Sequence, residues 1–398
     1  MATTKITSPD LFNLESLNTA LKLPSGTTAE RPTSPSTGEW RYNTTTNLVE
    51  FWDGGEWRDL QSEEIPPINS ENFNAVTYTG NSSTQSITGV GFKPDWVWIK
   101  ERGPAAENHN LIDSTRGTSK ILASNNSNAE FTSTRFTSFD ADGFTLANNN
   151  ETNDSGSTYV AWCWKAGGGT TSTNNDGNVT TTVQVNSKAG FSIIKTANSD
   201  FNVSRTFGHG LNGVPDLFII KALSKTFEWR VYTSANSYAG FLQLNDSAAQ
   251  TNLTTNVTST TFNTTWTPTG ATYESEWIMY AFKSVAGYSS FGTYTGNGST
   301  NGPIVNTGFE PAFVITKRSS TTGGWVIFSN KLSTANPRVQ YFQANVNNAE
   351  ETLTGGMDFL SNGFQLKETD AELNGNGDTF IYIAFAADAS TAPTLADS

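Results

Sequence analysis

The fold is decided by the stretch Gly91-Phe92-Lys93-Pro94-Asp95-Trp96-Val97-Trp98-Ile99-Lys100, because similar stretches recur twice later in the chain. The second copy is Gly213-Val214-Pro215-Asp216-Leu217-Phe218-Ile219-Ile220-Lys221, and the third is Gly308-Phe309-Glu310-Pro311-Ala312-Phe313-Val314-Ile315-Thr316-Lys317. In each copy a proline-led turn precedes an apolar run that ends at lysine. Such a run predicts a strand buried on both faces, with proline at its entrance, where a missing N–H does least harm.

Other elements recur around these strands in the same order. Tyr78-Thr79-Gly80-Asn81 precedes the first copy as Tyr294-Thr295-Gly296-Asn297 precedes the third, and each copy closes with an aromatic-rich strand such as Tyr159-Val160-Ala161-Trp162. Six or seven short strands in about 95 residues are typical of a β-sandwich. The sequence therefore predicts an all-β protein with three β-sandwich repeats in series, over residues 72–166, 189–285 and 286–388. A C-terminal tail, 389–398, follows.

Residues 167–188 separate the first two repeats. The segment opens with Gly167-Gly168-Gly169 and continues with Thr, Ser, Asn and Asp, a composition typical of flexible linkers. We expect a polar linker here.

The first 65 residues differ from the repeats. Ser8-Pro9-Asp10 has the features of a helix start, and Leu11, Leu14, Leu17 and Leu21 then fall on one helical face. A mini-sheet is predicted next from three short segments that carry Trp40, Trp52 and Trp57, and a sheet of this size is not stable alone. We therefore expect the four leucines and three tryptophans to mediate attachment or oligomerisation. Closed symmetry commonly buries such a stripe, which favours a homotrimer.

Two parts of the chain carry a resemblance. Residues 28–35, 38–43 and 53–57 resemble a short module common in phage tail-fibre and other virion proteins. The repeats, with Tyr294-Thr295-Gly296-Asn297-Gly298, the lysine-terminated strand and residues 159–167, resemble an uncharacterised repeat in structural proteins of marine tailed phages, especially cyanophages. This resemblance implies a virion component and brings no catalytic residues. The second repeat departs most from it, because it lacks the Tyr-Thr-Gly-Asn start and the later Asx-Gly turn.

Composition excludes several classes of protein. A formal net charge of −13 argues against a surface that binds nucleic acid or an anionic membrane. No stretch approaches the roughly 20 apolar residues of a membrane span, so we expect no membrane insertion. The N-terminus has no apolar signal region, so we expect synthesis in the host cytoplasm. A single cysteine, Cys163, excludes an internal disulfide framework and a multi-cysteine metal site.

The residue types that commonly form catalytic or metal sites in proteins are few or widely spaced in this sequence. His109 and His209 lie in different repeats, which argues against a histidine triad or zinc site, and Cys163 lies in a closing strand, where a core thiol is expected. Residues 140–143 and 374–378 place oxygen ligands at alternate positions, as calcium loops do, but Asx-Gly turns explain both. Paired carboxylates leave a polysaccharide-degrading tailspike as an alternative. We expect no enzyme activity, catalytic residue, cofactor or metal.

The sequence thus predicts a virion structural protein, a tail fibre or similar surface appendage that is anchored by its N-terminus. The alternative is a capsid decoration protein that stabilises the shell. If one repeat contacts a host glycan or protein, the third is favoured, because it lies farthest along the chain from the anchor. Its loop with Arg318, Ser319, Thr321 and Thr322 is polar, and we expect it to reach outward.

Overall fold

The computed structural model contains two compact units, Met1–Ile65 and Pro66–Ser398. Almost all of the secondary structure is β, which confirms the predicted all-β class. The structure describes residues 23–60, 71–103, 105–197, 199–200, 205–264 and 274–386. The predicted helix with Leu11, Leu14, Leu17 and Leu21, and the C-terminal tail 389–398, lie outside these residues.

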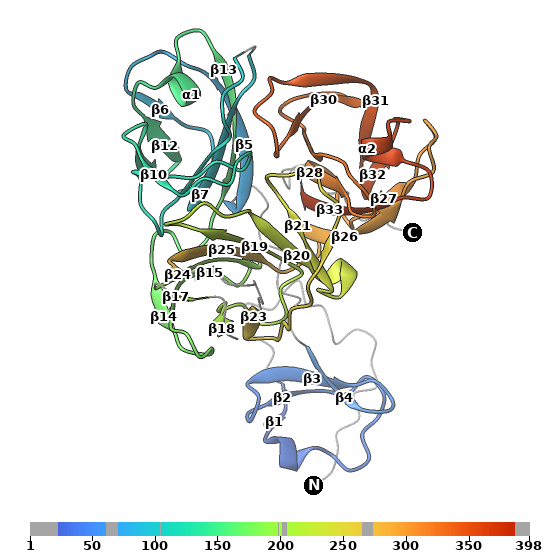
Figure 1. Cartoon of the computed structure of the whole chain (residues 1–398). Helices are drawn as coiled ribbons and strands as arrows, with labels where there is room; N and C mark the ends of the chain where they lie inside the picture. Colours follow the sequence, from blue (N-terminus) through green and yellow to red (C-terminus); the bar gives the residue numbers. More distant parts are fainter. Residues whose placement is uncertain are drawn as a thin grey trace, which may run out of the picture. The chain divides into compact units, whose positions relative to one another are not determined.

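The N-terminal unit contains one four-stranded sheet with the order β1-β2-β3-β4 (Figure 1). Its three antiparallel strands are the segments that the sequence predicted, joined by short polar turns. The first strand was not predicted; it is only two residues long and pairs parallel to β2. The elements are β1 (Ser25–Gly26), η3 (Thr28–Glu30), β2 (Trp40–Asn43), β3 (Leu48–Trp52) and β4 (Trp57–Leu60).

The first repeat has a main sheet with the order β5-β13-β7-β8 and a second sheet with the order β11-β12-β6. The lysine-terminated strand is β7, next to the closing strand β13. The elements are β5 (Phe73–Thr79), β6 (Gln85–Ile87), β7 (Trp96–Glu101), β8 (Asn110–Asp113), β9 (Lys120–Ile121), β10 (Phe131–Thr132), β11 (Phe136–Asp140), β12 (Gly143–Leu146), α1 (Asn150–Asn153) and β13 (Thr158–Trp164).

The second repeat has the same central order, with β16-β25-β19-β20-β21 inside a longer sheet that starts at β14 and ends at β22. Its elements are β14 (Ser172–Asn174), β15 (Thr181–Asn186), β16 (Phe191–Thr196), β17 (Ser199–Asp200), β18 (Arg205–Gly208), β19 (Leu217–Ala222), β20 (Arg230–Thr233), η5 (Ser234–Asn236), β21 (Gly240–Gln243), β22 (Thr251–Asn252), β23 (Thr261–Thr264), β24 (Glu274–Ser275) and β25 (Trp277–Phe282).

The third repeat follows the same plan, with the order β26-β33-β28-β29-β30-β31-β32-β27. The turn that feeds β32 needs glycine, because a Cβ on Gly363 would lie 2.0 Å from the carbonyl oxygen of Val305. The elements are β26 (Ser289–Thr295), β27 (Ile304–Asn306), β28 (Pro311–Arg318), β29 (Trp325–Ser329), β30 (Arg338–Gln343), β31 (Glu351–Leu360), β32 (Gly363–Leu366), α2 (Ala371–Asn374) and β33 (Thr379–Ala386).

The recurring Tyr-Thr-Gly-Asn motif has a structural role. The Tyr294 hydroxyl donates to the carbonyl of Leu373 in α2, and the backbone N–H of Asn297 donates to the buried side chain of Asn374. Gly296 lies so close to α2 that a Cβ would be 2.3 Å from the carbonyl oxygen of Gly375. The first repeat makes the same contacts, from Tyr78 to Thr152 and from Asn81 to Asn153. The motif thus fastens the first strand of the repeat to the short helix.

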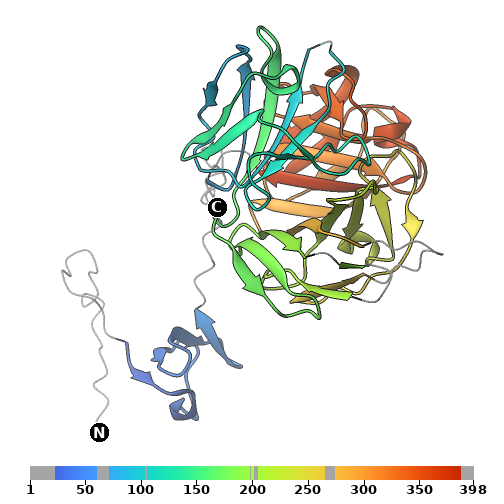
Figure 2. The same ribbon diagram turned by 60° about the vertical axis from the view of Figure 1, so that its left-hand side comes forward.

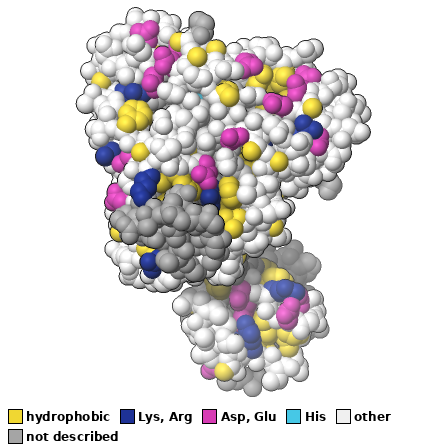
Figure 3. All heavy atoms as spheres, viewed as in Figure 1, with side chains coloured by type: hydrophobic (Ala, Val, Ile, Leu, Met, Phe, Trp, Pro, Cys, Tyr) yellow, Lys and Arg dark blue, Asp and Glu magenta, His cyan; other side chains and the backbone are white. Residues whose placement is uncertain are grey.

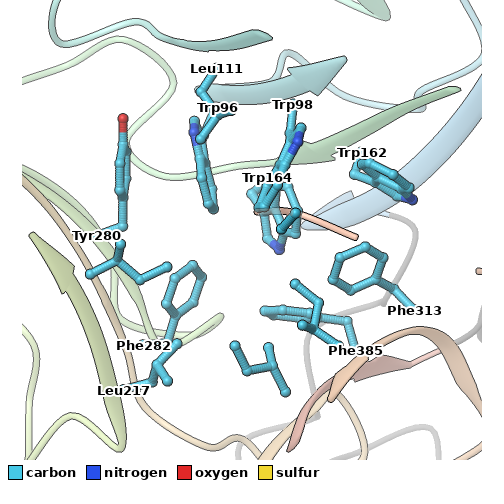
Figure 4. Packing of buried hydrophobic residues seen from close by; sticks show 14 of the residues in the cluster. Trp96, Trp98, Leu111, Trp162, Trp164, Leu217, Tyr280, Phe282, Phe313 and Phe385 are labelled. Atoms are coloured by element: carbon cyan, nitrogen blue, oxygen red, sulfur yellow. The ribbon is translucent and has the colours of Figure 1, made fainter. Parts of the chain in front are cut away.

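The lysine-terminated strands are buried on both faces, as predicted. In β7, Val97 and Ile99 face the second sheet of their own repeat, while Trp96 and Trp98 face away from it. In each repeat, the side chains on the opposite face of the main sheet point toward the other two repeats. Together they form one shared core, which Figure 4 shows as converging aromatic rings. Its centre includes Trp96, Trp98, Trp162, Trp164, Leu217, Tyr280, Phe282, Phe313 and Phe385.

The three repeats form a closed ring around this core, and both views show them side by side (Figures 1 and 2). Equivalent hydrogen bonds recur at the three junctions. The Trp229 indole donates to the carbonyl of Ala123 in the first repeat (2.8 Å), and the Trp325 indole donates to Gln243 in the second (2.7 Å). His109 Nε2 lies 3.2 Å from the Gln343 carbonyl, which joins the first repeat to the third.

Backbone contacts confirm the threefold pattern. Three N–H groups cross the junctions to equivalent carbonyls: Glu130 to Leu223 (2.9 Å), Gln250 to Ser319 (3.1 Å) and Glu350 to Arg102 (3.3 Å). The ring closes through the last pair, where Arg102 also forms an ion pair with Glu350 at 2.6 Å. We predicted sandwiches in series; instead, the shared core requires each repeat to pack against the other two.

The predicted flexible linker, 167–188, is also corrected. Its residues form the hairpin β14–β15, which extends the sheet of the second repeat along β16. The Gln184 side chain donates to Ser114 (2.9 Å) and Thr115 (2.8 Å) of the first repeat. Polar residues are compatible with a strand here because Gln184 satisfies its hydrogen bonds at a junction between repeats.

Candidate functional site

His109 is a structural link of the ring. The Trp98 indole N–H donates to Nδ1 at 2.9 Å, so Nε2 carries the proton and donates to the Gln343 carbonyl. Burial, together with the charge of Lys100, lowers the pKa of His109 well below its usual value and keeps it neutral. Its backbone N–H binds the Asn125 side chain, as those of Trp229 and Trp325 bind Asn245 and Asn345. His109 therefore replaces an indole, and no reacting group lies beside it among the contacts described.

His209 and Cys163 are also built into the protein interior. His209 accepts the backbone N–H of Leu211 at Nδ1 (3.1 Å), and Nε2 lies 3.3 Å from the Thr258 carbonyl. Burial lowers the pKa of His209. Cys163 is fully buried in the first repeat, and burial raises the pKa of its thiol. A buried thiol with a raised pKa is a poor nucleophile.

The two calcium-like loops bind other parts of the protein. Asp142 accepts the backbone N–H groups of Gly91 (2.6 Å) and Gly89 (3.1 Å), which lower its pKa. Asp378 pairs with Arg318 and accepts the Ser320 hydroxyl. Among the described residues, no group of three His, Cys, Asp or Glu side chains is arranged to hold a metal ion.

The predicted host-contact loop is held against the second repeat. Arg318 is half-buried in its pair with Asp378, and the Ser319 N–H donates to the Thr379 carbonyl at 2.9 Å. Gly323 donates to the Ser247 carbonyl across the junction at 2.9 Å. The loop does not extend freely as we expected, because its backbone forms part of the ring. Thr321 is half-buried and Thr322 is exposed.

The N-terminal unit is organised around a buried carboxylate. Glu50 on β3 is fully buried and binds Arg31 at 2.6 Å, Arg41 at 3.2 Å and the Asn43 amide at 3.0 Å. The hydrogen bond from Arg31 and its charge lower the pKa of Glu50 against the effect of burial. Through Glu50, Arg31 thus holds the segment before β2 against the sheet. This network was not predicted from the sequence.

A groove of about 400 Å³ lies beside this network. Trp40 on β2 stacks on Phe51 with ring centroids 5.5 Å apart and is 46% exposed, while Trp57 is half-buried. Figure 3 shows hydrophobic side chains next to charged ones on this unit. The lining consists of Pro24, Ser25, Glu30, Pro32, Glu39, Trp40, Arg41 and Trp57.

Two of the three predicted tryptophans therefore line one groove. The third, Trp52, packs its ring against Trp57 at 5.8 Å and is half-buried. Glu30 and Glu39 belong to the same groove but were not among the predicted residues, because no spacing in the sequence links them to Trp57. Their approach depends on β1 pairing with β2 and on Arg41 of β2, which donates to the Glu30 carbonyl.

Comparison with protein families shows that residues 68–389 match the model described as domain of unknown function (DUF7483). The chain belongs to the DUF7483 family. The match covers all three repeats together, so the whole ring corresponds to one DUF7483 domain, and the groove lies outside it. No curated protein and no solved structure matches the chain.

The described part of the chain also contains no helix that is long and apolar enough to cross a membrane.

Proposed function

We propose that the chain is a structural component of a tailed-phage particle, a surface appendage that attaches through its N-terminal unit and presents the DUF7483 ring. The observation that carries the proposal is the division of roles between the two units. In the ring, the histidines and the calcium-like loops bind other parts of the chain, and the cysteine is buried in the core. In the N-terminal unit, Trp40 and two exposed carboxylates line an open groove. This division supports binding and assembly rather than catalysis.

A capsid decoration protein is the second candidate, and the closed ring favours it over a long spacer. Three repeats in series would extend with each added repeat, whereas three repeats around one core form a compact body. Such a body suits a subunit that covers a shell surface as well as one at the end of an appendage. Both candidates require a partner in the particle for the N-terminal unit.

The proposal is tested by deleting residues 1–65 from the gene in the phage that encodes the chain. Purified particles are then analysed by quantitative mass spectrometry, with full-length protein as the reference. We expect full-length protein at a fixed ratio to the capsid protein, and truncated protein in the lysate but not in particles. The truncated protein keeps the ring, so circular dichroism must show the same β-rich spectrum. Particles that lack the full-length chain, or that incorporate the truncated chain normally, would contradict the proposal.

A further inference from the structure

We propose that the groove of the N-terminal unit binds a basic, proline-containing segment of a partner protein. This inference rests on the proposed function, because it names the chemistry of the partner to which the unit attaches. The groove volume, about 400 Å³, lies within the range of ligand-binding clefts, about 300–1,000 Å³.

The charge of the groove favours a cationic ligand. Among the described lining residues Arg41 is the one cation, and it is buried: it donates to the carbonyls of Glu30 (2.8 Å) and Thr27 (2.9 Å) and pairs with Glu50. The other charged lining residues are Glu30 and Glu39, and both are exposed. No ion pair to Glu39 is formed within residues 23–60. An arginine or lysine side chain would therefore meet two carboxylates and, among residues 23–60, no exposed cation of the lining that competes for them.

Glu30 is also fixed in place. Its carboxylate accepts the Thr27 backbone N–H at 2.7 Å and the Thr27 hydroxyl at 3.0 Å, as in a capping box. These hydrogen bonds lower the pKa of Glu30, so it is ionised near neutral pH. A carboxylate held in this way presents its charge without a further loss of side-chain freedom when a ligand binds.

The apolar lining favours proline next to the cation. Trp40, stacked on Phe51, presents a flat ring, and Pro24 and Pro32 add flat apolar surface. Aromatic-lined grooves bind polyproline II segments because such segments are already extended and lose little entropy on binding. An arginine beside the prolines can in addition stack on an exposed indole. A neutral sugar fits less well, because Arg41 is buried and directs two of its N–H groups to the carbonyls of Glu30 and Thr27 rather than into the groove.

Fluorescence anisotropy of the full-length chain with labelled peptides tests the inference. The probes are four repeats of Pro-Pro-Arg, four repeats of Gly-Ser-Arg and four repeats of Pro-Pro-Glu. We expect saturable binding of the Pro-Pro-Arg peptide, about tenfold tighter than either of the others and weaker in high salt. Trp40→Ala and Glu39→Gln should each weaken it by at least about threefold.

Phe131→Ala is the matched control, because Phe131 is a similarly exposed aromatic residue (40%) in the ring. It should leave binding unchanged, and Glu39→Gln should keep the wild-type near-ultraviolet circular dichroism. Equal binding of Gly-Ser-Arg and Pro-Pro-Arg, no saturable binding, or unchanged affinity in both groove variants would overturn the inference. If the truncated chain is still excluded from particles in that case, the proposed function stands and only the chemistry of the groove is wrong.

Discussion

Single buried polar residues determine how the repeats of this protein join. Trp98 and His109 form one such pair: the indole holds the imidazole so that its other nitrogen reaches Gln343 in the third repeat. Trp96, Trp162 and Trp164 also lie in the shared core, but their buried indole nitrogens have no hydrogen-bond partner among the described residues. Tryptophans with similar burial therefore differ in their contribution to stability: all fill the core, but Trp98 also forms a hydrogen bond.

Replacing Trp98 and Trp164 by phenylalanine separates these contributions. Both changes remove a similar ring volume, but Trp98→Phe also leaves buried Nδ1 of His109 without its donor. An unsatisfied buried group costs about 1–3 kcal/mol, so Trp98→Phe should destabilise the ring more than Trp164→Phe by about that amount. Urea unfolding followed by circular dichroism measures the difference. Equal losses of stability would show that the Trp98–His109 hydrogen bond contributes nothing.

Sequence reasoning argued against a catalytic triad or a zinc site at either histidine but could not find the partners of His109. Its equivalence to Trp229 and Trp325 is hidden because an imidazole replaces an indole. Only the asparagines Asn125, Asn245 and Asn345, which bind the three backbone N–H groups, retain the pattern. Glu50 was missed for a similar reason, because an isolated glutamate in a strand reads as a solvent-exposed residue until Arg31 and Arg41 are placed beside it.

At the scale of elements, the three lysine-terminated strands carry the strongest regularity. Lys100, Lys221 and Lys317 are buried, and each donates to the carbonyl of the next residue. Lys221 and Lys317 also reach Ser127 and Ser247 in the preceding repeat, and Lys100 lies over the Phe342 ring of the third repeat. The sequence showed where these strands begin and end, but not that each final lysine lies at a junction.

These lysines predict how stability depends on pH. Burial lowers their pKa values to about 8 for Lys100, about 7 for Lys221 and about 8 for Lys317. An unfolded chain holds lysine protons up to about pH 10.4, so above about pH 7 the unfolded state binds more protons than the folded state. The free energy of unfolding should therefore increase from pH 7 to about 9.5.

Thermal unfolding at a series of pH values checks this prediction, with Lys221→Met as the comparison. The variant should lose part of the increase between pH 7 and 9.5, because one proton-linked group is removed. Below about pH 6 all three lysines are protonated in both states, and their contribution should be constant. A free energy of unfolding that falls over this interval, or a variant with the wild-type slope, would contradict the assignment.

The hairpin β14–β15 shows where element prediction from sequence stops. Val183 and Val185 alternate with polar residues as a strand requires, but glycine, asparagine and threonine dominate the segment. Whether such a segment pairs depends on an available edge, and β16 provides one. Hydrogen bonds from Gln184 to Ser114 and Thr115 also hold the hairpin in place. These two partners lie in the first repeat, far from Gln184 in the sequence, so local sequence does not reveal them.

For the whole molecule, the ring predicts that a single repeat cannot fold alone. Phe313, Phe385 and Ile315 of the third repeat face the shared core, and an isolated repeat would expose them to water. We therefore expect residues 286–388 to aggregate or remain unfolded, and residues 66–398 to give one cooperative calorimetric transition. A soluble, folded third repeat, or three separate transitions, would mean that the shared core contributes little. The repeats were visible in the sequence, but their closure depends on contacts between distant strands.

Electron cryomicroscopy of purified particles tests the central proposal, that this chain is a surface component of a tailed phage and is held by its N-terminal unit. We expect compact, three-lobed density on the particle surface, with the N-terminal unit at the contact with another particle protein. Absence of this density from particles of normal composition would contradict the account. So would density in which the ring makes the contact while the N-terminal groove faces solvent.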